Sequence, residues 1–88
     1  MSRIELPSLD AFVAALRRDG IDAAAMRVVD EIRPVARGSA VEVGPQRWVE
    51  LYAYRGGTVY TARVLDLPAD VERALVGLRV RRVSGNLG

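Results

Sequence analysis

Aromatic side chains recur at even-numbered positions of one short segment, as Trp48, Tyr52 and Tyr54. Successive side chains of a strand point to opposite faces, so an extended segment would place all three rings on one face. Rings on a sheet among arginines can hold unstacked bases, while guanidinium groups contact phosphates. The pattern therefore predicts non-enzymatic, sequence-independent binding of single-stranded nucleic acid, DNA in preference to RNA. The arginines expected to contact phosphates are Arg47, Arg55, Arg63, Arg79 and Arg81.

Two other uses of this aromatic face stay open. Aromatic sheet faces are also common at subunit contacts, which would make the chain an oligomerising module or a regulatory or inhibitory subunit. Alternatively, Glu42 and Glu50 could bind a magnesium ion on this face and hydrolyse a nucleic acid. Each glutamate has an arginine available across the sheet, so an ordinary ion pair explains it better. We therefore assign no catalytic and no metal-binding residue.

The composition removes the side chains on which most enzymes depend. The chain has no Cys and no His, and because it also lacks Lys, all 13 of its basic residues are Arg. Thiolate and imidazole chemistry, Cys-type zinc sites, Schiff bases and a Walker-type lysine are therefore excluded. We expect neither enzyme activity nor a cofactor. The formal net charge is only +2, so binding of a polyanion depends on how the arginines are distributed.

A hairpin is expected to position the rings. Residues 47–55 and 58–66 are rich in Val, Tyr and Trp, and they flank Gly56-Gly57, a pair typical of a two-residue hairpin turn. Such a turn pairs Arg55 with Thr58 and thereby fixes the register. The predicted pairs include Val49 with Val64, Leu51 with Ala62, Tyr52 with Thr61, Glu50 with Arg63 and Trp48 with Leu65.

Shorter segments complete an antiparallel meander. Residues 22–36 fit either a helix or an alternating strand, and we favour a helical turn at 22–25 followed by an edge strand at about 27–36. A strand is expected at 40–44, and a loop at 44–46 joins it to the aromatic segment. A two-residue turn at Arg37-Gly38 would place Arg33 opposite Glu42.

Two segments have helical periodicity. From Ser8 to Asp19, four apolar residues recur at i, i+3, i+4 and i+7, with Ser8 as the N-cap and Gly20 as the left-handed stop. Leu67-Pro68 opens a second helix. The alternating residues 78–83 then suit a last strand.

The chain is thus predicted to be a single α+β domain over residues 1–88, with 84–88 as a flexible tail. Its fold would be an antiparallel β-meander of about four strands, packed on one face by an N-terminal helix and a C-terminal helix. Small domains are only marginally stable, so we expect a homo-oligomer, a dimer or higher. No apolar run approaches the roughly 20 residues of a membrane span. A cytoplasmic location without a membrane partner is the corresponding expectation.

The N-terminal helix, the meander segment Arg47-Trp48-Val49-Glu50-Leu51-Tyr52-Ala53-Tyr54-Arg55 and the Arg-rich composition resemble the archaeal ThermoDBP-related single-stranded DNA binding proteins. The resemblance covers the architecture of most of the chain and carries no diagnostic motif, so it assigns no binding residue. It implies sequence-independent binding of single strands and self-association.

Overall fold

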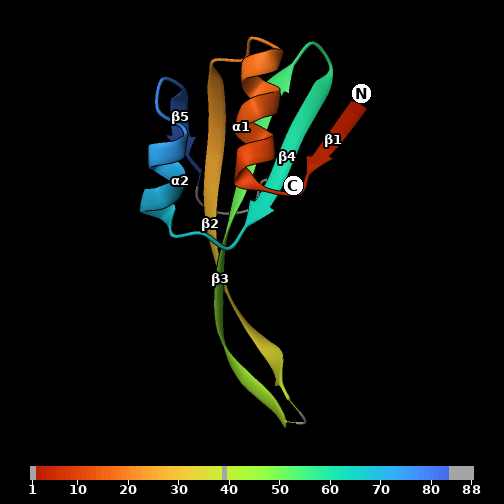
Figure 1. Ribbon diagram of the computed structural model, residues 1–88, viewed down its shortest axis with the longest axis vertical. Coiled ribbons are helices and arrows are strands. Elements are labelled where there is room, and N and C mark those ends of the chain that lie inside the picture. Colours follow the sequence, from red (N-terminus) through yellow and green to blue (C-terminus); the bar gives the residue numbers. More distant parts are fainter. Residues whose placement is uncertain (1, 39, 84–88) are drawn as a thin grey trace.

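The computed structural model describes residues 2–38 and 40–83, which form a five-stranded sheet and two helices (Figure 1). The elements in chain order are β1 (Ser2–Leu6), α1 (Leu9–Arg18), β2 (Ala23–Arg37), β3 (Ala40–Arg55), β4 (Thr58–Val64), α2 (Pro68–Ala74) and β5 (Arg79–Arg82). The strand order across the sheet is β1-β4-β3-β2-β5. The expected α+β class is therefore confirmed.

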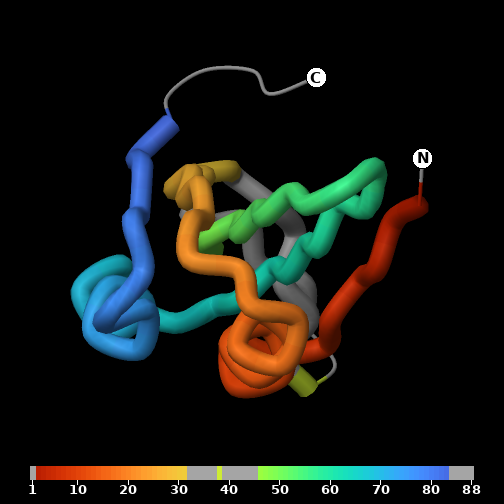
Figure 2. The backbone as a smooth tube through the Cα atoms, turned by 90° about the horizontal axis from the view of Figure 1, so that it is seen from above, coloured from red at the N-terminus to blue at the C-terminus, as the bar shows by residue number. Residues whose placement is uncertain are grey.

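The sheet is mixed, so the prediction of a purely antiparallel meander is wrong at both edges. Strands β2, β3 and β4 are antiparallel neighbours, whereas β1 pairs in parallel with β4 and β5 pairs in parallel with β2. Each edge strand is linked through a helix: α1 connects β1 to β2, and α2 connects β4 to β5. Both connections join parallel strands and cross the sheet in the same direction. Two such crossovers with the same handedness must place their helices on the same face of the sheet. Figure 2 shows both helices on the same side of the sheet.

The β3–β4 hairpin has the register predicted from Gly56-Gly57. Its seven pairs run from Val49 opposite Val64 to Arg55 opposite Thr58. Gly56 and Gly57 have φ values of 55° and 86°, and a type I′ turn requires positive φ at both central residues. Strand β4 ends at Val64, before the expected Asp66, so the predicted pair of Trp48 with Leu65 is not part of the ladder.

The β2–β3 pair differs from its prediction in length and register. The expected helical turn at 22–25 is wrong, because β2 already begins at Ala23, and the expected loop at 44–46 is part of the continuous strand β3. Arg37 pairs with Ala40, which shifts the register and places Arg33 opposite Gly44 instead of Glu42. From Trp48 toward the connecting turn, β2 and β3 pair only with each other among the described residues. Pro34 and Pro45, which lack a backbone N–H, therefore remove no hydrogen bond to a third strand. Figure 1 shows this two-stranded arm extending away from the helices.

Helix α1 forms as its periodicity predicts. The Ser8 hydroxyl accepts a hydrogen bond of 3.1 Å from the Ala11 amide, which caps the first turn. Gly20 follows the helix with a φ of 68°, a conformation that favours glycine. The side chains of Phe12 and Leu16 are fully buried against the sheet.

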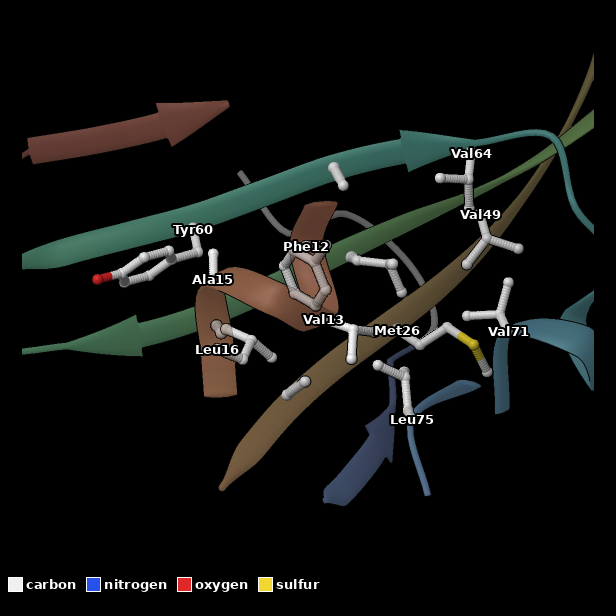
Figure 3. Packing of buried hydrophobic residues seen from close by; sticks show 14 of the residues in the cluster. Phe12, Val13, Ala15, Leu16, Met26, Val49, Tyr60, Val64, Val71 and Leu75 are labelled. Atoms are coloured by element: carbon white, nitrogen blue, oxygen red, sulfur yellow. The ribbon is translucent and has the colours of Figure 1, made fainter. Parts of the chain in front are cut away.

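The hydrophobic core lies between the two helices and one face of the sheet (Figure 3). Helix α2 contributes Val71, followed by Leu75, and the sheet contributes Met26, Val49 and Leu51, all with at most 1% of their surface exposed. Burial of these side chains supplies the main stabilisation of the fold. Because both helices cover this face, neither of them covers the opposite face of the sheet.

Neither helix in the described part of the chain has the length and apolar character that crossing a membrane requires. The predicted tail at 84–88 lies outside the described residues.

Candidate functional site

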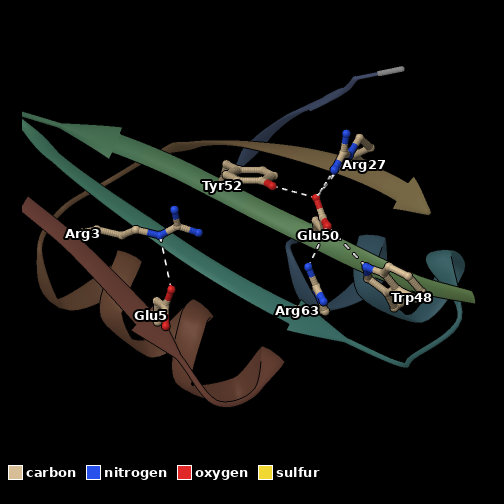
Figure 4. A network of polar contacts seen from close by, with 7 residues as sticks. All are labelled: Arg3, Glu5, Arg27, Trp48, Glu50, Tyr52 and Arg63. Carbon is tan, nitrogen blue, oxygen red and sulfur yellow. Dashed lines mark hydrogen bonds and ion pairs between the residues drawn. The ribbon is translucent and has the colours of Figure 1, made fainter. Parts of the chain in front are cut away.

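The sheet face that the helices leave uncovered, called the open face below, carries the predicted aromatic row. Along β3, the odd-numbered residues from Val49 to Ala53 point into the core, so the even-numbered ones point to the open face. Figure 4 shows Trp48, Glu50 and Tyr52 on the side away from the helices. Alternation and register place the following residues on the same face: Arg3, Glu5, Ala23, Ala25, Arg27, Tyr54, Val59, Thr61, Arg63, Arg79 and Arg81.

A groove of about 580 Å³ runs between β3 and the edge strand β5. Its two walls carry different chemistry, since Tyr52 and Tyr54 come from β3 while Arg79 and Arg81 come from β5. Strand β2 lies between them and contributes the small side chains of Ala23 and Ala25, while that of Ala24 points into the core. The register aligns Tyr52, Ala25 and Arg81 in one row across three strands. We call this feature the Tyr–Arg groove.

The charged wall of the Tyr–Arg groove is open to an anion. Arg79 forms one ion pair of 3.2 Å with Asp22, and both side chains are about 80% exposed, so the pair is weak. Arg81 lies in the groove wall, and within residues 2–38 and 40–83 no carboxylate forms an ion pair with it. On the opposite wall, Tyr54 is 62% exposed. The groove therefore offers an accessible aromatic ring and an accessible guanidinium group.

Glu50 is the centre of a polar network on the open face (Figure 4). The residue is 7% exposed. Its carboxylate accepts hydrogen bonds from the Tyr52 hydroxyl at 2.7 Å, the Arg27 Nε at 3.1 Å, the Trp48 indole N–H at 3.3 Å and the Arg63 Nη2 at 3.2 Å. Burial alone would raise the pKa of Glu50, but the hydrogen bonds from Tyr52, Arg27 and Trp48 and the charge of Arg27 outweigh it and lower the pKa to about 2. The carboxylate is thus charged at neutral pH and anchors the Tyr52 ring.

Trp48 lies beneath the open face and is not free to stack a base. Its side chain is 3% exposed, and the Arg63 guanidinium lies 5.1 Å from the centre of its ring. A base could reach this ring only after displacing Arg63. Trp48 therefore packs beneath the open face and is not part of its accessible surface.

Two of the arginines predicted to contact phosphates lie on the other side of the sheet. Arg47 and Arg55 are odd-numbered residues of β3, on the side of the helices. Arg47 Nε lies 2.6 Å from Asp30 Oδ1. Arg55 donates a hydrogen bond to the carbonyl oxygen of Asp19 at the end of α1. The structure therefore separates this pair from Arg63, Arg79 and Arg81.

Sequence reasoning missed the parts of the site that come from β1 and β2. The stretch Ala23-Ala24-Ala25 was interpreted as helical, and alanine is the strongest helix former, yet here it supplies the floor of the groove. Residues 3–6 alternate polar and apolar, with Arg3 and Glu5 on one face, so a signal for β1 was present but short.

The two residues considered for a magnesium site lie far apart along the sheet. Glu42 and Glu50 lie eight residues apart on the continuous strand β3, about 27 Å at the rise of an extended chain. The reason is the missing loop at 44–46, which would have folded these positions closer. Among the side chains that the structure describes, which exclude those of residues 32–37 and 40–45, no group of three or more His, Cys, Asp or Glu could hold a metal ion.

Comparison with known proteins gives no further indication. No protein-family model matches the sequence, and no curated protein matches it.

Proposed function

We propose that this chain binds single-stranded nucleic acid in the Tyr–Arg groove. Bases stack on Tyr54 and Tyr52, and phosphates contact Arg81 and Arg79. The observation that carries the proposal is that the tyrosine wall, where Tyr54 is exposed, faces an arginine wall across a floor of alanines, and that Arg81 in this wall has no ion pair with a carboxylate among the described residues.

The dimensions of the groove suit a nucleotide. Its two walls are two strand spacings apart, about 9.6 Å. The long Arg side chain can bridge part of this distance to a phosphate while the base rests on the opposite wall. Bases inside a duplex are stacked on each other and cannot lie against the tyrosines, so the groove selects single strands.

The chemistry of the groove supports binding without sequence preference. Every base has a π-face, so stacking on tyrosine tolerates all four bases, and arginine contacts to phosphate carry no sequence information. The same behaviour is what the resemblance to the ThermoDBP-related proteins implies. Trp48, Arg47 and Arg55 are not included in the proposed contact set, and the predicted residues that line the groove are Tyr52, Tyr54, Arg79 and Arg81. Arg63 lies outside this groove.

Substitution in each wall tests the proposal by fluorescence anisotropy of a labelled oligothymidine. Tyr54→Ala removes a stacking ring and should cost about 1–3 kcal/mol, which is roughly a 5- to 150-fold loss of affinity. Arg81→Ala should weaken binding and reduce the dependence of log K on log salt by about 0.7, the contribution of one phosphate contact to a single strand.

Matched controls come from the opposite side of the molecule. Arg17→Ala removes the same charge from an exposed position of α1, and Val76→Ala truncates a side chain that is 73% exposed. Both should bind as the wild-type protein does. Groove variants with wild-type affinity, or equal binding of a duplex, would refute the proposed site.

A second candidate is an interface between copies of this chain, and the exposure of Tyr54 beside Val59 and the alanine floor favours it. In that case, wild-type protein would self-associate and bind no oligonucleotide. Sedimentation velocity would then show that Tyr54→Ala shifts the protein to monomers, whereas the proposed function predicts the same oligomeric state for both.

A further inference from the structure

A second hollow lies on the open face, on the other side of Tyr52. Its volume is about 320 Å³, and its lining includes Arg3 and Glu5 of β1, Thr61 and Arg63 of β4, and Glu50 and Tyr52 of β3. Tyr52 also lines the Tyr–Arg groove, so this one side chain separates the two. We call the second feature the Arg3–Arg63 hollow.

The Tyr52 ring is held in a position that suits contact from both sides. Its hydroxyl donates to Glu50 at 2.7 Å, and in Figure 4 the ring stands nearly edge-on, with its hydroxyl directed along β3. One face of the ring therefore looks toward β2 and β5, and the other toward β4 and β1. A ring oriented in this way can stack one base on each face.

The Arg3–Arg63 hollow carries cations that a phosphate can reach. The side chains of Arg3 and Arg63 are 65% and 58% exposed. Arg3 is paired with Glu5 at 3.4 Å, but both side chains are exposed, so the pair is weak and can be exchanged for a phosphate. Burial and the hydrogen bond to Glu50 raise the pKa of Tyr52, while the charges of Arg27 and Arg3 lower it, so Arg3 lies within electrostatic reach of the phenol.

We propose that the Arg3–Arg63 hollow is a second phosphate subsite and that the bound strand crosses the sheet from β5 to β1, passing over Tyr52. This inference rests on the proposed function, because it extends the path of the same ligand. The ligand then contacts Arg81 and Arg79 at one end and Arg63 and Arg3 at the other, with bases on both faces of the Tyr52 ring. The path spans four strand spacings, about 19 Å.

A path of this length predicts that affinity depends on the length of the oligonucleotide. A short oligothymidine that fills only the Tyr–Arg groove should not reach Arg3. One of about eight nucleotides, within the site sizes of about 4–16 nucleotides found for small single-strand binding folds, should reach both ends.

The test compares Arg3→Ala, Arg81→Ala and the matched control Arg17→Ala on a trinucleotide and on a longer oligothymidine. Arg3→Ala should lower affinity for the longer ligand about three- to tenfold, reduce its salt dependence by about 0.7, and leave the trinucleotide unaffected. Arg81→Ala should weaken both ligands, and Arg17→Ala neither.

The outcomes separate the two proposals. If Arg81→Ala weakens the longer ligand and Arg3→Ala does not, the second subsite is refuted while the groove stands. If the wild-type protein binds neither ligand at low salt, the proposed function itself is refuted. Arg3 is preferred to Arg63 for this test because Arg63 also packs over Trp48, and its loss would disturb the support of the sheet.

Discussion

At the scale of single residues, Glu50 has the largest influence on the open face. Its buried carboxylate accepts hydrogen bonds from four side chains, two of which are arginines. A buried charge is costly unless it is paired, and here the pairing is complete, since no buried side-chain nitrogen or oxygen of the described residues lacks a partner. Glu50 therefore both stabilises the fold and fixes the orientation of Tyr52.

Glu50→Gln should destabilise the protein on the order of 3 kcal/mol, because it removes the buried charge that pairs with Arg27 and Arg63. Urea denaturation at pH 7 measures this loss. The control is Glu5→Gln, which changes an exposed pair on the same face and should have little effect.

The pKa values also predict how stability depends on pH. The pKa of Glu50 is about 2 in the folded protein, below its ordinary value of 4.5, so its contribution is fully present above pH 4.5. The contribution is lost as the pH falls from 4.5 toward 2. Asp19 acts in the same direction, because hydrogen bonds from Arg18 and Tyr60 lower its pKa to about 2 as well. The melting temperature should therefore fall over this range, and less steeply in Glu50→Gln; parallel curves would contradict the role of Glu50.

Individual residues differed in how well the sequence predicted them. Alternation along a strand was enough to place Tyr52 and Tyr54 on one face and Glu50 opposite Arg63. It could not show that Trp48 is buried, because burial depends on where the Arg63 side chain lies. Nor could it show that Arg47 forms an ion pair with Asp30 whereas Arg81 has none among the described residues. Ion pairing across strands depends on the strand register, which the sequence left ambiguous.

At the scale of elements, helices and the short hairpin were predictable and the sheet edges were not. The N-cap at Ser8 and the glycine pair at 56–57 are local signals, and each determines one element. Strands β1 and β5 are short and pair with strands distant in sequence, so no local sequence pattern predicts which strand each one pairs with. The β2–β3 register failed because the turn lies one residue later than expected.

The arm formed by the outer parts of β2 and β3 is predicted to be dispensable for folding. Asp30 pairs with Arg47 through a 2.6 Å ion pair close to the body, so this pair can close a shorter hairpin. Replacing residues 31–46 with the dipeptide Asn-Gly supplies a suitable two-residue turn. The shortened protein should keep its cooperative unfolding and its affinity for oligothymidine. Loss of binding with retained folding would show that the arm contributes to the site, contrary to our account.

At the scale of the whole molecule, the topology explains why one sheet face is available for a ligand. Both helical connections lie on one side, so the core forms there and the other side keeps its polar and aromatic residues. On that side of the described body of the sheet, leaving out the arm that begins at Glu31, five arginines (Arg3, Arg27, Arg63, Arg79 and Arg81) accompany two glutamates (Glu5 and Glu50), and Asp22 forms an ion pair with Arg79. The positive charge that is small over the whole chain is thus concentrated where the rings lie.

The central claim is that bases stack on the tyrosines of the open face, and the three tyrosines of the chain allow a direct test. Tyr60 faces the core, is 6% exposed and donates to Asp19, so it serves as an internal control. We would record the aromatic proton NMR signals of tyrosine-labelled protein while adding oligothymidine. Our account predicts that the signals of Tyr52 and Tyr54 shift upfield through the ring currents of stacked bases, while those of Tyr60 stay in place. Binding that leaves the signals of Tyr52 and Tyr54 unchanged would contradict it.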